Sequence, residues 1–382
     1  MNYDDFSTDS PGTLVPTESG AFAFRPNPLP PDIDLAEITE SLAEASSSLG
    51  ELKGACRRLN NPYIFIRPLQ RLEAQTSSAM EGTHTTADKL ALAESGVQTS
   101  TDSQTQEVNN YVRALRAAIT SLEEMPITHR TLRDAHSTLL SGVGRDRGED
   151  KLPGEFKRLQ NMIGGTTLEK ARFIPATPTD TPNCISELEE FVNSERPIGL
   201  ALLDIALAHY QFETIHPFAD GNGRVGRILI SLMAISRGLL EEPALFVSPA
   251  LEGVKDEYIE RLYRVSAFGE WTEWLNFFFA AVSTAAHRTV DTIDRIITLH
   301  EHYRTKASEI STSANLLSII DMLFEVPVIR ARDVVRQLSI TDAAARGLLA
   351  KLVEAEILFE VDLYPKAWLA TELVQLSAPR QN

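Results

Sequence analysis

The sequence predicts a mostly α-helical protein that ends in a small domain of three helices and two strands. Apolar residues recur at helical spacing through most of the chain. Two long segments, 197–215 and 228–240, are apolar on nearly all sides, which is typical of helices enclosed by other helices. Strand-like patterns are short and occur between Pro153 and Pro178 and near 357–370.

The composition limits the classes of function. With 382 residues, 43% of them hydrophobic, the chain can form two or three domains with real cores. Its formal net charge of -17 argues against a general role in coating nucleic acid or an anionic membrane. Cys56 and Cys184 lie in no metal-ligand pattern and predict buried thiols in a reducing cytosol. There is no secretory signal pattern, and the apolar stretch 275–282 is too short to span a bilayer, so we expect a cytoplasmic protein with no membrane role.

The first half of the chain alternates between loops and helices. Residues 1–30 are rich in Ser, Thr, Pro and Gly and show no apolar period, so we expect a flexible arm. Helical spacing then appears in the segments 34–52, 66–80, 105–121, 127–140 and 185–195. Between Pro153 and Pro178, FKRLQNMIG and ARFIPA flank the turn-like GTTLEK, which predicts a β-hairpin.

The C-terminal part has the pattern of a winged helix-turn-helix domain. A helix over about 291–302 leads into it, and 311–375 contains three helical segments followed by two short strands. Its third helix would be the recognition helix, but basic residues there are few beyond Arg346 and Lys351. Protein interaction or dimerisation is therefore favoured over specific DNA binding, and salt-dependent retention on duplex DNA would reverse that ranking.

The stretch HPFADGNGRVGR, 216–227, gathers several chemically distinct groups. Its Gly-Asn-Gly turn stands before a predicted helix, where backbone N–H groups can bind an anion. Arg224 and Arg227 share one side of that helix, so both can reach the anion. Asp220 suits a Mg²⁺ ion that bridges phosphates, and His216 can accept a proton near neutral pH. A base, a metal and a polyphosphate describe phosphoryl or nucleotidyl transfer.

The same stretch matches the Fic signature HPFx(D/E)GNGRxxR at every defined position, so the chain resembles a Fic-domain AMP transferase. The resemblance implies a helical Fic core with a β-hairpin flap, in which His216 deprotonates a hydroxyl of a target protein. It implies that Asp220 holds Mg²⁺ and that the turn and the two arginines bind the phosphates of ATP. The implied phosphate-binding residues are Gly221, Asn222, Gly223, Arg224 and Arg227. Some Fic relatives move phosphocholine or phosphate instead, but the intact signature favours AMP transfer.

A second match lies upstream, in SSAMEG at 77–82. Ser77, Glu81 and Gly82 fit the (S/T)xxxE(G/N) inhibitory motif of many Fic proteins. In those proteins the glutamate pairs with the last arginine of the signature, here Arg227, and takes the place of the γ-phosphate. The alternative is that Glu81 and Gly82 simply end a helix. The resemblance also allows Glu81 to position water for the removal of AMP, so the net direction of the reaction stays open.

Two further assignments follow from the resemblance. The hairpin between Pro153 and Pro178 resembles the family's flap, whose edge could hold a target segment by strand addition, although relatives often have tryptophan where Met162 stands. Tyr258 is a candidate for contact with adenine, and a core role with a satisfied hydroxyl is its alternative.

The predicted function is transfer of AMP from ATP to a Thr, Ser or Tyr hydroxyl of an unidentified target protein, with self-modification as a hypothesis. A DNA-binding or protein-binding regulator that acts through the winged helix, or forms a homodimer, is the alternative. The predicted regions are a flexible arm (1–30), a helical region with the inhibitory motif (31–125), a Fic catalytic core (126–290), a linker helix (291–310) and the winged helix-turn-helix domain (311–382).

Overall fold

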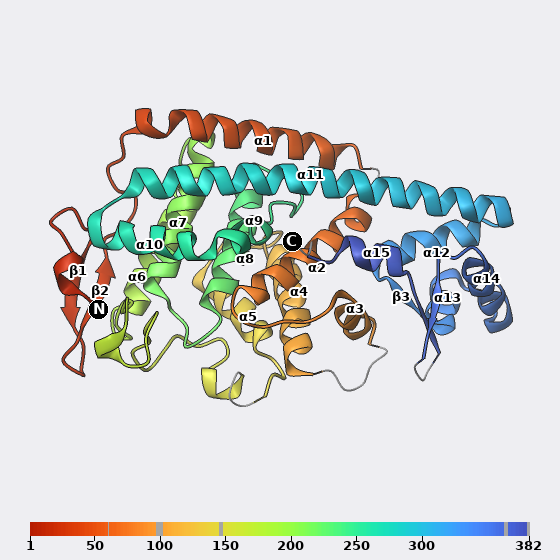
Figure 1. The fold of residues 1–382 in the computed structure, drawn as a ribbon, viewed down its shortest axis with the longest axis horizontal. Helices are drawn as coiled ribbons and strands as arrows, with labels where there is room; N and C mark the ends of the chain where they lie inside the picture. The colour runs from red at the N-terminus through yellow and green to blue at the C-terminus, as the bar shows by residue number, and fades with distance from the viewer. Residues whose placement is uncertain (60, 97–101, 145–147, 363–365, 380–382) are drawn as a thin grey trace. The chain divides into compact units, whose positions relative to one another are not determined.

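The computed structural model describes residues 1–59, 61–96, 102–144, 148–362 and 366–379. Helices dominate these residues, as the sequence predicts (Figure 1). The chain forms two compact units. The first unit contains residues 1–53 and 113–287, and the second contains residues 54–112 and 288–382. Within the described residues, no helix is long and apolar enough to cross a membrane.

The start of the chain is folded, so the prediction of a flexible arm is wrong for it. Strands β1 (Gly12–Pro16) and β2 (Phe22–Pro26) pair antiparallel. Ala23 and Phe24 are fully buried, and the backbone N–H of Phe24 donates to the carbonyl of Ile174 at 2.8 Å. The polar composition of this region concealed β2, in which the adjacent residues Ala23 and Phe24 are both buried, so that side chains on both faces of the strand are covered.

The core of the first unit surrounds two helices, α7 (Ala201–Ile215) and α8 (Asn222–Ser236), which pack against each other. All residues of α7 except Glu213 are buried, as its uniformly apolar pattern predicts. The helices around this pair are α5 (His129–Leu139), α6 (Thr181–Asn193), α9 (Ser248–Leu251) and α10 (Lys255–Phe268).

Helix α11 (Trp271–Ile310) runs for 40 residues without Gly or Pro. The predicted boundary at 290/291 therefore falls inside a continuous helix, and the predicted linker is not a separate element. In the first unit, α1 (Thr39–Arg57) lies along α11, as Figure 1 shows. A hydrogen bond of 2.8 Å between the hydroxyls of Ser48 and Ser283 joins these two helices.

The predicted hairpin between Pro153 and Pro178 is less regular than expected. Its two segments pair antiparallel at one bridge, between Ile163 and Phe173. Gly164 and Gly165 follow this bridge, and the only regular element of the turn is a short 3₁₀ helix at Leu168–Lys170. We call residues 153–178 the flap.

The second unit combines N-terminal helices with the C-terminal part of the chain. Its sheet has the antiparallel order β3 (Val328–Ile329), β5 (Ala367–Leu369), β4 (Phe359–Val361). Strand β3 and the helices α3 (Ala87–Ser95) and α15 (Thr371–Leu376) were not predicted. The elements of this unit, together with α4, which continues into the first unit, are α2 (Pro62–Ala79), α3 (Ala87–Ser95), α4 (Ser103–Ser121), α12 (Ala314–Glu325), β3 (Val328–Ile329), α13 (Ala331–Leu338), α14 (Asp342–Glu354), β4 (Phe359–Val361), β5 (Ala367–Leu369) and α15 (Thr371–Leu376).

Helix α2 belongs to the same core as the C-terminal elements, so the region predicted over 31–125 is divided between the two compact units. It packs against α12 and α15. The guanidinium of Arg71 on α2 donates to the carboxylate of Glu94 at 2.6 Å and to the carbonyl of Glu325. The amide of Gln75 donates to the carbonyl of Ser377 at 2.8 Å. The region is divided because the buried face of α2 packs against helices near the C-terminal end of the sequence.

Candidate functional site

The loop between α7 and α8 holds HPFADG, residues 216–221, which we call the motif loop, and the following NGRVGR begins α8. His216 ends α7 in the left-handed conformation, with φ 51, and Gly221 precedes α8 with φ 78. The left-handed conformation costs a non-glycine residue roughly 1–2 kcal/mol, so the surroundings must hold His216 in place. At Gly221 an added Cβ would also lie 3.1 Å from Leu139 Cδ2, so the position requires glycine.

The imidazole of His216 has a defined orientation. Its Nδ1 lies 3.2 Å from the carbonyl oxygen of Glu213, and a carbonyl can only accept, so Nδ1 carries the proton. The lone pair is therefore on Nε2, which makes this nitrogen the proton acceptor. The ring is half-buried, so a substrate can approach it.

The side chain of Asn222 closes the motif loop. Its Oδ1 accepts from the backbone N–H of Phe218 at 2.8 Å, and its Nδ2 donates to the carbonyl of Phe218, also at 2.8 Å. This pairing fixes where α8 begins. The first-turn N–H groups of α8 thus form the positive end of a helix dipole beside His216, which is a suitable position for an anion.

Two buried guanidiniums add to that positive end. Arg224 is 0% exposed and Arg227 is 2% exposed. Arg224 Nη2 lies 3.6 Å from the carboxylate of Asp220. Guanidiniums bind phosphate oxygens through charge-assisted hydrogen bonds, so a polyphosphate is a suitable ligand for this end of α8.

Asp220 fits a magnesium ion that is shared with a substrate. Its side chain is 35% exposed, and its Oδ1 accepts from the N–H of Gly221 at 2.6 Å. Among the residues described, no cluster of three or more His, Cys, Asp or Glu could hold a metal. Mg²⁺ is usually bound through one or two carboxylates, waters and the phosphates of its substrate, so a single carboxylate beside a phosphate site is compatible with it.

His136 on α5 supports the loop and was missed in the sequence. Its ring stacks on Phe218 with centroids 4.0 Å apart. Its Nδ1 accepts from the N–H of Gly154 at 3.0 Å, so its Nε2 carries the proton and donates to the carbonyl of Asp220 at 3.0 Å. Burial lowers the pKa of His136 to about 4, which keeps the ring neutral. In the sequence it has no signal beyond a histidine on the buried face of a helix.

Lys157 and Asn161 of the flap also bind the carbonyls of the motif loop. No sequence pattern indicated this role, because the two residues lie about 60 positions before the loop. Gly226 was missed too. A Cβ there would lie 2.2 Å from Oε1 of Glu213, so the glycine lets this carboxylate approach α8.

Tyr258 lies in the core of the first unit. It is buried, and its hydroxyl lies 2.9 Å from Nε2 of His209. The other ring nitrogen of His209, Nδ1, lies 3.3 Å from the carbonyl of Gly226 in α8. Burial lowers the pKa of His209 to about 3, so the ring is neutral. This placement gives Tyr258 a structural role, and its contact with adenine stays a prediction.

The residues of the upstream motif lie at the end of α2 in the second unit. Ser77 is fully buried, whereas Glu81 is exposed. Gly82 has φ 77, the left-handed conformation with which a glycine often ends a helix. This agrees with the alternative that Glu81 and Gly82 simply end α2. The pairing of Glu81 with Arg227 stays a prediction.

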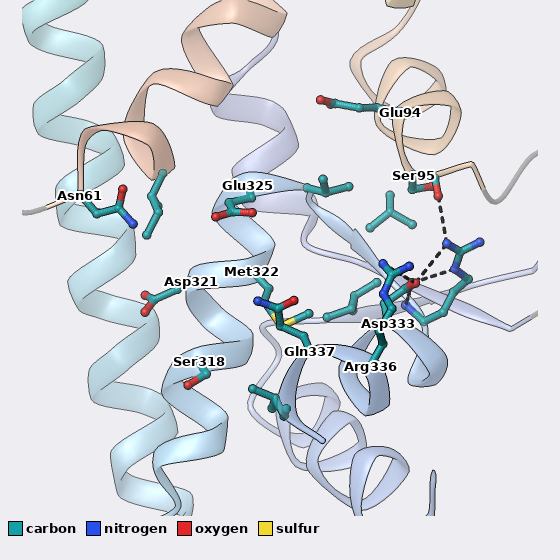
Figure 2. Close-up of a pocket in the computed structure, with 16 residues that line it drawn as sticks. Asn61, Glu94, Ser95, Ser318, Asp321, Met322, Glu325, Asp333, Arg336 and Gln337 are labelled. Atoms are coloured by element: carbon teal, nitrogen blue, oxygen red, sulfur yellow. Dashed lines mark hydrogen bonds and ion pairs between the residues drawn. The ribbon is translucent and has the colours of Figure 1, made fainter. Parts of the chain in front are cut away.

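The second unit also contains a cavity of about 520 Å³. Figure 2 shows it between α2, the end of α3, α12 and α13, with Asp321 and Met322 on α12 and Asp333 and Gln337 on α13. None of the predicted site residues lines this cavity.

Fold and loop together define a mostly helical protein with a glycine-containing turn between two buried helices. Residues 39–120 match the family model described as Fic/DOC family N-terminal, and residues 126–234 match that of the Fic/DOC family. The chain belongs to the Fic/DOC family.

Curated relatives and solved structures agree with this assignment. The protein adenylyltransferase Fic of Drosophila melanogaster is 28% identical over 237 residues, which cover 59% of this chain and 44% of that protein. The chain thus spans less than half the length of the curated relatives it matches. A Fic family protein from Desulfovibrio desulfuricans has the same fold, with a TM-score of 0.57, 18% identity, and coverage of 90% of this chain and 98% of that one. A Fic domain containing signaling protein from Bacteroides thetaiotaomicron gives a TM-score of 0.51 at 20% identity, with 67% and 96% coverage.

Proposed function

We propose that this chain is a protein adenylyltransferase, which moves AMP from ATP to a hydroxyl side chain of a target protein. The observation that carries the proposal is the motif loop, which brings the imidazole of His216 to the same helix start as the buried guanidiniums of Arg224 and Arg227. The curated relatives named protein adenylyltransferase Fic support the choice of AMP as the group transferred.

The geometry suits an in-line displacement. His216 Nε2 takes the proton of the target hydroxyl while its oxygen attacks the α-phosphorus of ATP. A new P–O bond to the target forms, the bond from the α-phosphorus to the bridging oxygen breaks, and pyrophosphate leaves. The two arginines and the first-turn N–H groups of α8 stabilise the charge that develops on the leaving group. Mg²⁺ held by Asp220 would neutralise further phosphate charge when bound.

We further propose that Glu81 inhibits this reaction by pairing with Arg227 in place of the γ-phosphate. The support is the SSAMEG motif and the exposed position of Glu81 beyond the end of α2. A carboxylate that binds a guanidinium this way competes directly with ATP. The same carboxylate could orient water for removal of AMP, and the chain's own hydroxyls are candidate targets.

Labelled ATP tests the proposal. The Glu81→Gly protein is incubated with Mg²⁺, a cell lysate and ATP labelled at either the α- or the γ-phosphate. We expect protein label from the α position alone, and none with the additional change His216→Ala. Label from the γ position alone, or from neither, would contradict AMP transfer. If Glu81→Gly binds ATP no better than the parent, the inhibitory role is wrong.

A second candidate function concerns the C-terminal part of the second unit. Three helices, α12 to α14, and the antiparallel strands β3, β5 and β4 have the order of a winged helix-turn-helix domain. The exposed face of α14 offers alanines, and its Arg346 is already paired with Asp342 at 2.6 Å. This favours a protein partner or a homodimer over DNA. Retention on duplex DNA that decreases with salt would contradict this choice.

A further inference from the structure

We propose that Lys157 and Asn161 of the flap are positioning residues, which hold the backbone of residues 215–218 so that the imidazole of His216 faces the target hydroxyl. The inference rests on the proposed function of His216 as the base. It assigns to the flap a second role besides target docking, namely to support the motif loop through hydrogen bonds to its backbone.

Lys157 binds three consecutive residues of this backbone. Its Nζ donates to the carbonyls of Ile215 at 3.0 Å and His216 at 2.9 Å, and its backbone N–H donates to the carbonyl of Pro217 at 2.8 Å. The third donor of the ammonium goes to Oδ1 of Asn161 at 2.9 Å. All three protons of the ammonium therefore have acceptors.

Asn161 completes the set. Because its Oδ1 accepts from Lys157, its amide group is oriented with Nδ2 toward the motif loop. Nδ2 donates to the carbonyls of His216 at 3.1 Å and Phe218 at 3.0 Å. Lys157 and Asn161 thus bind every carbonyl from residue 215 to residue 218.

The hydrogen bonds of Lys157 and Asn161 lie at the end of α7 and at the left-handed residue His216. Ile215 is the last residue of α7, whose final carbonyls lack intrahelical partners, and a cation is favourable at that end of a helix. His216 itself is in the left-handed conformation, which the two donors on its carbonyl help to maintain. The orientation of the imidazole follows from this backbone, because Nδ1 donates to the carbonyl of Glu213 one turn earlier.

The choice of a lysine for this task is costly. Lys157 is 3% exposed, and burial lowers its pKa to about 7. A buried ammonium destabilises a core unless its hydrogen bonds offset the free energy of desolvation, and an apolar side chain of similar size would fill the space without that cost. A contribution to the geometry of His216 explains why the position carries an amino group with several hydrogen-bond acceptors in place of an apolar side chain.

The test separates positioning from general stability. In the Glu81→Gly protein, Lys157→Met keeps the length of the side chain but removes its donors. We expect kcat for AMP transfer to fall about 100-fold, the cost of a misplacement of about 1 Å, while KM for ATP changes little. Lys157→Arg, which keeps a cationic donor, should recover part of kcat. The matched control is Lys53→Met, which also removes a lysine that donates to a carbonyl, that of Gly238 at 3.0 Å, and should leave kcat unchanged.

A second variant and a second readout keep the test independent of folding and of activity. Asn161→Ala removes the donors to His216 and Phe218 from a half-buried position, so it should fold if Lys157→Met does not. Nitrogen NMR of the His216 ring, assigned by comparison with His216→Ala, should show the Nδ1–H tautomer in the parent and a mixture of tautomers in the folded variants. An unchanged tautomer together with unchanged kcat would overturn the inference. If the parent does not transfer AMP at all, the proposed function fails, and the NMR result alone decides whether the two residues position His216.

Discussion

Single buried histidines make the stability of the first unit depend on pH. Burial lowers the pKa of His136 to about 4 and that of His209 to about 3, whereas a histidine in the unfolded chain has a pKa of about 6.5. Between these values the unfolded state binds protons that the folded state does not. The contribution of these two histidines to stability is therefore complete above about pH 6.5 and decreases as the pH falls toward their folded-state pKa values, by up to about 1.4 kcal/mol per pH unit for each histidine.

Thermal unfolding at pH values from about 7.5 to 5 measures this dependence. We expect the Tm to decrease over this range in the wild-type protein and to decrease less steeply in His209→Gln, which cannot take up the proton. Equal slopes for the two proteins would contradict the assignment of a neutral, buried His209.

A second residue-scale prediction concerns Gly221. Gly221→Ala places a Cβ at φ 78 and 3.1 Å from Leu139 Cδ2 at the start of α8. We expect a loss of stability of at least roughly 1–2 kcal/mol together with loss of ATP binding, because the phosphate-binding turn is displaced. Calorimetric titration with ATP and denaturant unfolding check both effects, in the Glu81→Gly background.

Gly238 provides the control for this prediction. It has φ 71 but nothing within 4 Å of an added Cβ. Gly238→Ala should therefore lose a similar amount of stability from backbone strain alone and keep ATP binding. If both variants bind ATP equally well, the Gly221 turn does not form the anion site.

At the scale of elements, the flap presents an apolar side chain to solvent. Leu159 is 83% exposed, so its side chain is available to contact a docked segment. If the flap docks target segments, Leu159→Ser should raise KM for the protein target several-fold and leave KM for ATP unchanged. Ile198→Ser, at a 64% exposed position outside the flap, is the control and should change neither value. An equal KM for the target in all three proteins would exclude Leu159 from docking.

Elements with a strong local pattern were the predictable part of the fold. The uniformly apolar segments became α7 and α8, and the order of groups in the motif was sufficient to expect a base and an anion site between them. The supports of that site could not be predicted. These supports are contacts between segments that are distant in the sequence, made by His136, Lys157 and Asn161. The residues adjacent to them in the sequence form no pattern that predicts these contacts. The packing of α2 on α12 and α15 was missed for the same reason.

At the scale of the whole molecule, helix α2, which ends within the SSAMEG motif, depends on the C-terminal part of the chain. An apolar cluster of Ala91, Val328, Ala367 and Val374 joins α3, β3, β5 and α15. Helix α2 packs on α3 and α15 and donates through Gln75 to the carbonyl of Ser377. Residues 54–112 are therefore expected to unfold together with residues 288–382 and not by themselves.

Val374→Asp tests this dependence, because it places a carboxylate in the apolar cluster. We expect several kcal/mol of destabilisation and faster hydrogen exchange along α2 and α3. Since Glu81 follows α2, the proposed inhibition should weaken as well, so AMP transfer by a protein that keeps Glu81 should increase. Gln375→Asp adds the same charge at the neighbouring exposed position and should change neither exchange nor activity. Unchanged exchange of α2 in folded Val374→Asp would contradict the shared core. Faster hydrogen exchange without increased AMP transfer would mean that the stability of α2 does not control the reaction.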